Sequence, residues 1–150
     1  MIVTARKLAN ASRSKPRQAD LRRAISTAYY ALFHALAKDA ADLLVGVGTN
    51  RPDKAWSHLY RSLQHGDART HCEAARGMTF PPQIKDCAYL FVELQQMRHD
   101  ADYSPDRRYL RFDALQAIKH PEDAIAALKA APKRYRRAFA VQLLHKKRRS

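Results

Sequence analysis

The chain has 150 residues, 46% of them hydrophobic, so it can bury a core without help from disulfides or a metal. Its two cysteines, Cys72 and Cys87, match no metal-ligand spacing and are expected to be buried thiols. The first residues lack the apolar stretch of a signal peptide, and no apolar run approaches the ~20 residues of a membrane span. We therefore expect a soluble, cytoplasmic protein with no cofactor, no bound metal and no membrane partner.

The net charge of +14 lies at the two ends of the chain. Residues 1–23 carry a net +6 and residues 133–150 carry a net +8, whereas acidic and basic residues balance between them. Because charge of this size repels itself in a folded protein, it predicts a polyanionic partner such as RNA. A solubilising coat is the alternative interpretation of the basic tail.

The spacing of apolar residues places the first two helices. One helix is predicted over residues 2–13, and Pro16 then suits the start of the next. No glycine or proline interrupts residues 17–45, where apolar side chains recur at helical spacing. Gly46 and Gly48 provide the stop for this second helix.

Further helices are expected from Asp53 through Leu63, over 67–76, from Pro81-Pro82 to near Tyr103, over 112–131 and over 135–147. Asp53 suits an N-cap, and Gly66 is expected to close that helix. Pro121, which two acids follow, predicts a kink or a short break. With short connections and no convincing strand, the sequence predicts an all-α antiparallel bundle of four to six helices over residues 1–131. Residues 132–150 form a basic helix and tail, packed on that domain or extending from it.

Four polar or aromatic residues share one face of the second helix. Arg23, Thr27, Tyr30 and His34 fall at i, i+4, i+7 and i+11, which is almost three whole turns. Such a face is either a binding surface or a solvated flank above a packed tyrosine ring.

On the helix that ends near residue 103, Arg98 continues an apolar line. It follows Cys87, Phe91 and Leu94, where a guanidinium is costly to bury unless it meets an anion. Asp102, four residues later, can supply that anion within the helix. The alternative is a phosphate group bound through the guanidinium fork.

Three stretches of the chain carry a resemblance to a known family. They are ISTAYYALFHALAKDAADLL at 25–44, WSHLYRSLQHG at 56–66 and LQQMRHDADYSP at 94–105. Together they resemble HEPN domains over about residues 5–130, with the basic tail outside. The resemblance implies a helical bundle, commonly a homodimer, that binds RNA or cuts it without a metal. In active HEPN ribonucleases, an arginine on the late helix holds the phosphate and a histidine a few residues later assists attack by the ribose 2′-hydroxyl.

The late helix departs from the ribonuclease pattern after Arg98. Where the family places its histidine, this chain has Tyr103, Ser104 and Pro105. The stretch instead resembles the Arg-x-x-x-Asp-Tyr variant of HEPN-like proteins, in which Asp102 and Tyr103 accompany Arg98. The resemblance thus implies phosphate binding and leaves cleavage open.

If RNA is cut, the missing acid or base has to come from another helix. His34 and His58 are the candidates, since an unperturbed histidine titrates near neutral pH. The alternative for each is a hydrogen-bonded, partly buried imidazole with a structural role. The candidate catalytic residues are therefore Arg98, Asp102, Tyr103 and His34.

The C-terminal region mixes cations with aromatic rings, as single-strand binders do. Phe139 and Leu143 are expected to form a core stripe, which leaves Arg134, Arg137 and Lys147 in water. Contacts from this region to RNA are expected to be strongest at low salt and largely independent of sequence. The candidate RNA-binding residues are Arg23, Tyr30, His99, Arg134, Arg137, Lys146, Lys147, Arg148 and Arg149.

The sequence favours a dimeric, HEPN-like RNA-binding protein with weak or absent nuclease activity. The first alternative is an active, metal-independent ribonuclease of a toxin or defence system. The second is a non-enzymatic module that only dimerises or docks a partner protein, since a fold fixes function loosely.

Overall fold

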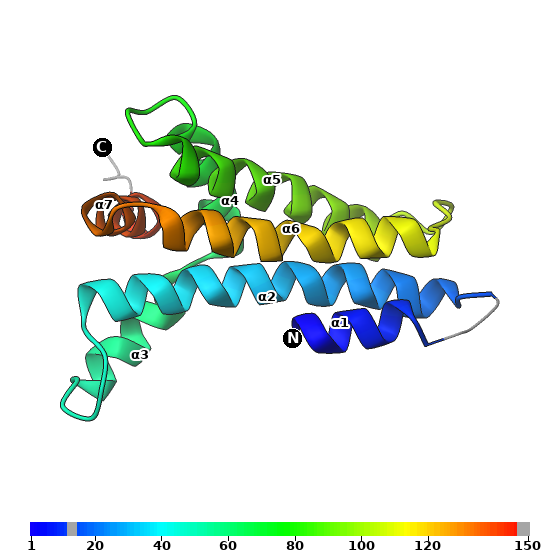
Figure 1. The fold of residues 1–150 in the computed structure, drawn as a ribbon, viewed down its shortest axis with the longest axis horizontal. Coiled ribbons are helices and arrows are strands. Elements are labelled where there is room, and N and C mark those ends of the chain that lie inside the picture. The colour runs from blue at the N-terminus through cyan, green and yellow to red at the C-terminus, as the bar shows by residue number, and fades with distance from the viewer. Residues whose placement is uncertain (12–14, 147–150) are drawn as a thin grey trace.

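The computed structural model describes residues 1–11 and 15–146 of the chain (Figure 1). Every regular element among these residues is a helix, which confirms the predicted all-α class. In chain order the helices are α1 (Ile2–Ala9), α2 (Gln18–Leu44), α3 (Asp53–Ser62), α4 (His65–Ala75), α5 (Pro82–Tyr103), α6 (Arg111–Ala130) and α7 (Lys133–Leu144). The three longest, α2, α5 and α6, run the length of the bundle (Figure 1).

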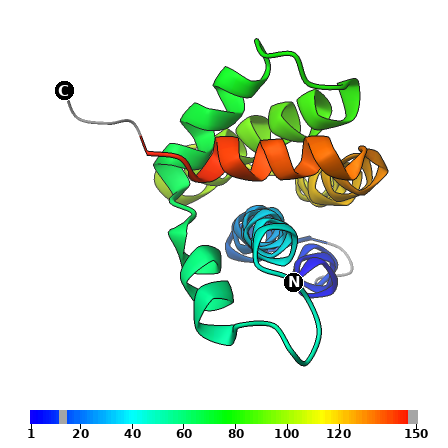
Figure 2. The same cartoon turned by 90° about the vertical axis from the view of Figure 1, so that its left-hand side faces the viewer.

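The longest helix, α2, lies at the centre of the fold. It packs against α1, α3, α5, α6 and α7, as the view along its axis shows (Figure 2). A helix with this many neighbours needs apolar residues on more than one side. The sequence meets that need, because Leu21, Ile25, Leu32 and Leu36 are buried on one face, and Tyr29, Phe33 and several alanines are buried on the adjoining faces. The alanines keep the helix narrow, so its neighbours can approach closely.

Two pairs of successive helices run in opposite directions. α1 is antiparallel to α2, and α5 is antiparallel to α6 (Figure 1). α2 and α6 also pack against each other, and these two helices run parallel because α5 returns between them in the chain (Figure 1). α3 and α7 instead cross the long helices (Figure 2). The antiparallel arrangement expected from short connections therefore holds for α1 with α2 and for α5 with α6, and fails for the other pairs named.

Several helix ends differ from those predicted. Gly66 lies in the first turn of α4 instead of closing α3, which already ends at Ser62. Asp53 is the first residue of α3 and not its N-cap, and its carboxylate accepts a hydrogen bond from Arg51 Nε at 3.0 Å. A carboxylate in the first turn still stabilises the positive end of the helix dipole.

The two outer helices are shorter than predicted. α1 ends at Ala9, and part of the predicted extension to residue 13 lies outside the described residues. α7 begins at Lys133 and ends at Leu144, where His145 adopts an extended conformation. His145 and Lys146 offer no apolar side chain to pack, so they do not prolong the helix, and the last predicted position, residue 147, lies outside the described residues.

Of the kink or short break predicted at Pro121, the break is absent, because α6 continues through this residue. A proline inside a helix removes one backbone donor and crowds the preceding turn. The ring of Pro121 is fully buried, like Ala117, Ile118 and Ala124 around it. Apolar burial against the bundle offsets the lost hydrogen bond, and the helix stays whole.

The basic helix α7 is packed on the bundle, against α2 and α4. Phe139 and Leu143 are buried, as predicted. Arg136 forms an ion pair with Asp39 of α2, and His71 of α4 donates from Nδ1 to the carbonyl of Leu143 at 2.9 Å. Part of the C-terminal charge therefore holds the fold together instead of facing solvent.

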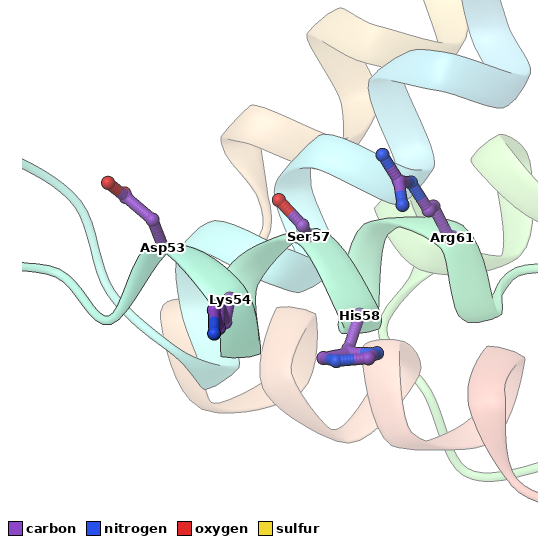
Figure 3. A pocket seen from close by; sticks show the side chains of 5 residues that line it. All are labelled: Asp53, Lys54, Ser57, His58 and Arg61. Atoms are coloured by element: carbon purple, nitrogen blue, oxygen red, sulfur yellow. The ribbon is translucent and has the colours of Figure 1, made fainter.

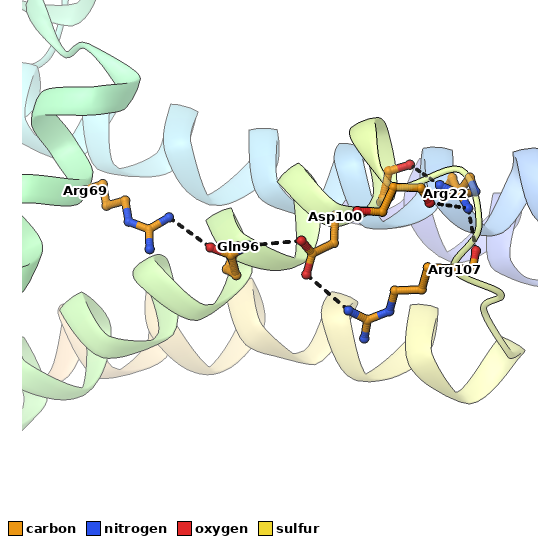
Figure 4. A network of polar contacts seen from close by, with 7 residues as sticks. Arg22, Arg69, Gln96, Asp100 and Arg107 are labelled. Atoms are coloured by element: carbon orange, nitrogen blue, oxygen red, sulfur yellow. Dashed lines mark hydrogen bonds and ion pairs between the residues drawn. The ribbon is translucent and has the colours of Figure 1, made fainter.

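A side chain of α2 holds the C-terminal end of α5. Arg22 donates to the carbonyls of Ala101 at 2.7 Å and Ser104 at 2.9 Å, and also to those of Pro105 and Arg107 (Figure 4). The last turn of α5 contains no basic residue. Arg22 thus supplies the cation that stabilises the negative end of a helix dipole.

No helix in the described ranges is both long and apolar enough to cross a membrane. Within the same residues, no three histidine, cysteine or acidic side chains are arranged to hold a metal ion. Cys72 and Cys87 are buried thiols, as predicted. Burial raises the pKa of both, that of Cys87 to about 12.

Candidate functional site

Arg98 lies on α5 and reaches across the tyrosine pair of α2. Its guanidinium carbon is 5.0 Å from the ring centre of Tyr29 and 5.9 Å from that of Tyr30. Its Nη1 donates to Asp102 at 3.2 Å, so the predicted pairing within the helix is present. The side chain of Arg98 is only 16% exposed, and its Nε is buried without a hydrogen-bond partner. The guanidinium is therefore held by rings on one side and a single carboxylate on the other.

Tyr29 connects Arg98 to a histidine that the sequence did not reveal. The Tyr29 hydroxyl lies 2.6 Å from Nδ1 of His65, the first residue of α4, and accepts a bond from Gln95 Nε2 at 3.3 Å. The direction of the bond between Tyr29 and His65 follows the tautomer of the imidazole: the hydroxyl donates when the ring proton is on Nε2, and it accepts when the proton is on Nδ1. In either case Nδ1 of His65 is occupied by Tyr29, and Nε2 is the second ring nitrogen.

The aromatic rings of α2 enclose His65. Its ring stacks on Phe33, with centres 3.9 Å apart, and lies 5.6 Å from Tyr29 and 5.8 Å from Tyr30. Gln95 also donates to the backbone carbonyl of His65 at 2.9 Å, which fixes the start of α4 against α5. These contacts hold the imidazole in one orientation.

The charges around this cluster shift three pKa values. Burial raises the pKa of Tyr29 to about 12, although Arg98 and Gln95 oppose the shift. Burial lowers the pKa of His65, and the charges of Arg98 and His34 lower it further. Burial alone would lower the pKa of Arg98, but the bond to Asp102 and the two tyrosines raise it overall. At neutral pH the site thus holds one cation beside a neutral imidazole and a neutral phenol.

His34 belongs to a row of rings that leads away from Arg98. The ring of Tyr30 is 6.3 Å from that of His34, and Nδ1 of His34 is 2.7 Å from the hydroxyl of Tyr60 on α3. Trp56 stacks on Tyr60 at 5.1 Å and donates to Asp42 at 2.9 Å. The row joins α2 to α3, and it starts at a ring that Arg98 contacts.

Two other predicted residues on α5 lie at the surface. The rings of His99 and Tyr103 contact each other at 4.9 Å, and Tyr103 is 66% exposed. In the part of the chain that the structure describes, neither ring contacts the guanidinium of Arg98. Arg23, one turn before Thr27 on α2, is also exposed. These side chains surround the Arg98 cluster without entering it.

The cations of α7 lie apart from Arg98. Arg134 and Arg137 are exposed, and Arg134 covers the ring of Tyr135 at 4.8 Å. α7 is anchored at Asp39, nine residues beyond Tyr30, which is about 14 Å along a helix. Lys146 is exposed, whereas the predicted contributions of Lys147, Arg148 and Arg149 lie outside the described residues.

His58 does not join the cluster. It lines a surface hollow of about 450 Å³ on α3 together with Asp53, Lys54, Ser57 and Arg61. Lys54 and His58 project from one side of the helix, and the other three residues project from the opposite side (Figure 3). Side chains that diverge in this way do not form a common site, and the structure gives His58 no contact with Arg98. Of the two histidines considered as acid or base, only His34 is connected to the Arg98 region.

A separate polar network runs along the exposed side of α5. Arg69 donates to Gln96 at 3.2 Å, Gln96 donates to Asp100 at 3.0 Å, and Asp100 pairs with Arg107 at 3.1 Å (Figure 4). These side chains satisfy one another's hydrogen-bonding groups. They therefore stabilise the contacts between α4, α5 and the following loop at the surface.

Comparisons of the chain with protein families, with curated proteins and with solved structures find no match.

Proposed function

We propose that the protein binds RNA and that Arg98 receives a backbone phosphate. The strongest support is the surroundings of the Arg98 guanidinium, which lies against two tyrosine rings. Among the described residues it has one hydrogen-bond acceptor, Asp102, whose side chain is 31% exposed. A guanidinium has five N–H donors in a planar fork that matches the oxygens of a phosphate.

Exposed cations elsewhere on the surface favour the same partner. Arg23 and the α7 residues Arg134 and Arg137 are exposed cations, and so is Lys146. Cations at several points on the surface hold a phosphate backbone without reading its sequence. Arg6, Arg22 and Arg136 are excluded from this role, since each has a structural partner.

Metal-independent cleavage of RNA is a second candidate function, because His65 lies beside Arg98 in the position of a relocated acid or base. The surroundings of His65 oppose it. Tyr29 occupies Nδ1, and burial together with the charges of Arg98 and His34 lowers the pKa of the ring, which makes it a weaker base toward a ribose hydroxyl. The site is thus better suited to holding a phosphate than to cutting beside it.

We further propose that two copies associate through the start of α6. Leu110, Phe112 and Leu115 are 69%, 66% and 38% exposed, and they lie close together in the chain. Exposed apolar side chains grouped in this way are typical of protein interfaces. Phe112→Glu is expected to convert a dimer into a monomer in analytical ultracentrifugation. A wild-type protein that sediments as a monomer at all concentrations would remove this proposal.

RNA binding is tested with fluorescence anisotropy on a labelled single-stranded RNA at low and at physiological salt. Arg98→Met is expected to weaken binding about 10- to 100-fold, the range for a hydrogen bond to a charged group. Arg76→Met is the matched control. Arg76 is an exposed arginine whose guanidinium covers one tyrosine ring, whereas Arg98 lies against two. Absence of binding by the wild type at low salt, or equal affinity of the two variants, would refute the proposal.

Cleavage is tested by incubating RNA with the protein in EDTA and resolving the products on a gel. Intact RNA is the expected result. Cutting that disappears in both Arg98→Met and His65→Ala would instead establish the second candidate function.

A further inference from the structure

A surface hollow of about 420 Å³ lies between α1, α2 and α3. Ala31 and Ala35 of α2 and Val3 of α1 are among the residues that line it. His34 and Tyr60 supply aromatic rings, and Lys38 supplies a cation. Its volume is within the range of about 300–1,000 Å³ that small-molecule sites have.

The rings of His34 and Tyr60 form one flat surface in this hollow. Their planes differ by only 10°, and their centres are 5.9 Å apart. A hydrogen bond of 2.7 Å joins the Tyr60 hydroxyl to Nδ1 of His34, so the rings meet at their edges and lie side by side. The result is an aromatic plate wider than either ring alone.

Residues that do not line the hollow hold the plate in place. Trp56 stacks on Tyr60, and Arg51 covers Trp56 with its guanidinium 4.1 Å from the ring centre. Trp56 also donates to Asp42 at 2.9 Å, which ties α3 to the end of α2. A surface that is already ordered loses little conformational entropy when a flat ligand stacks on it.

One aromatic ring separates the lining of the hollow from the phosphate site proposed at Arg98. Tyr30 lies between them, 5.9 Å from the Arg98 guanidinium and 6.3 Å from the His34 ring. The two sites are therefore separated by one aromatic ring, a spacing that a short run of nucleotides can span. No side chain lining the hollow is acidic, whereas Lys38 in its lining donates to Asp42 at 2.7 Å, so its charge is partly balanced.

We infer that this hollow binds a nucleobase, which stacks on the His34–Tyr60 plate while Arg98 holds a nearby phosphate. The inference rests on the proposed RNA binding and adds to it a pocket for one base. Stacking on aromatic rings is tolerant of base identity, because every base has a π face. Ala31 and Ala35 are the smallest side chains in the lining and leave room for the ring system.

The test compares adenosine 5′-monophosphate with ribose 5-phosphate, which has the same phosphate and sugar but no base. Trp56 is the chain's single tryptophan, so its fluorescence reports directly on the plate. Wild-type protein is expected to bind the nucleotide about tenfold more tightly, a typical gain for one stacked base. The nucleotide is expected to change the Trp56 emission, and ribose 5-phosphate is not.

Two variants test whether the base lies in the hollow. Tyr60→Leu removes one of the two rings of the plate, and Ala31→Leu puts a larger side chain into the hollow while leaving both rings in place. Both variants are expected to abolish the tenfold preference. Tyr89→Leu is the control, since Tyr89 is a partly exposed tyrosine on α5 that contacts Arg76. Circular dichroism and thermal unfolding confirm that each variant is folded, and either pocket variant suffices for the test.

Equal affinity for the two ligands in wild type overturns the inference, and so does a preference that survives in both pocket variants. RNA binding that still depends on Arg98 in those cases leaves the proposed function intact. Absence of any RNA binding by the wild type instead removes the proposed function, and the inference with it.

Discussion

Replacing Arg98 by methionine removes its charge and keeps an unbranched side chain against the tyrosine rings. The pair with Asp102, 31% exposed, contributes about 0.3–0.5 kcal/mol, as i,i+4 pairs do. The guanidinium over two rings contributes about 1–2 kcal/mol, since it is largely removed from water. Partial desolvation of the charge opposes both contributions. We therefore expect Arg98→Met to lower the free energy of unfolding by about 1 kcal/mol.

The same substitution is expected to raise the pKa of His65. The positive charge of Arg98 disfavours a second cation nearby, and its removal leaves burial and His34 as the causes that lower this pKa. Imidazole resonances followed by NMR during a pH titration measure the shift. Urea denaturation followed by circular dichroism measures the stability.

Arg76→Met is again the control, because Arg76 covers Tyr89 at 4.8 Å on an exposed part of the surface. Its stability change is expected to stay within about 0.5 kcal/mol, with the His65 titration unmoved. If Arg98→Met leaves the His65 titration where it is, the two residues are not neighbours and the site is wrongly assembled. Equal stability losses in the two variants would refute the contribution assigned to the rings.

Three further predictions concern the fold. The pKa of Tyr29 is raised from 10 in the unfolded chain to about 12 in the folded protein, so its contribution to stability is complete below pH 10 and is lost as the pH rises through 12. Urea titrations at each pH are expected to show a loss of about 3 kcal/mol that Tyr29→Phe lacks. Cys72 and Cys87 are expected to resist Ellman's reagent in the native protein and to react in denaturant, and rapid reaction of either native thiol would contradict their burial. Phe139→Ala is expected to cost about 3–5 kcal/mol in urea denaturation, against about 0.5 kcal/mol or less for the exposed control Val141→Ala.

The helices could be predicted because their apolar spacing is local. The pattern from Leu21 to Leu36 and the proline at the start of α5 both act within a few turns of the chain. The break expected at Pro121 was wrong because the outcome depends on what surrounds the ring. Local rules count the lost hydrogen bond, whereas the burial that offsets it comes from helices distant in the sequence.

The candidate site shows the same limit. Arg98 and Asp102 pair as their spacing of four predicts. His65 could not be identified beside Tyr29, since 36 residues separate the two and α3 lies between them in the chain. The clue that exists in the sequence is weak: the histidine belongs to the stretch at 56–66 that contributes to the HEPN resemblance. The HEPN resemblance itself stays a prediction.

The hydrogen bonds from Arg22 to the end of α5 have a consequence for proteolysis. The following loop contains two consecutive exposed arginines, Arg107 and Arg108, and so offers trypsin a dibasic sequence. A protease needs its substrate in an extended form, which requires the backbone to leave its hydrogen bonds. Here one guanidinium holds the carbonyls of Ala101, Ser104, Pro105 and Arg107 together. Cleavage in this loop therefore requires α2 and α5 to separate, which makes a surface loop a reporter of the packing at the centre of the bundle.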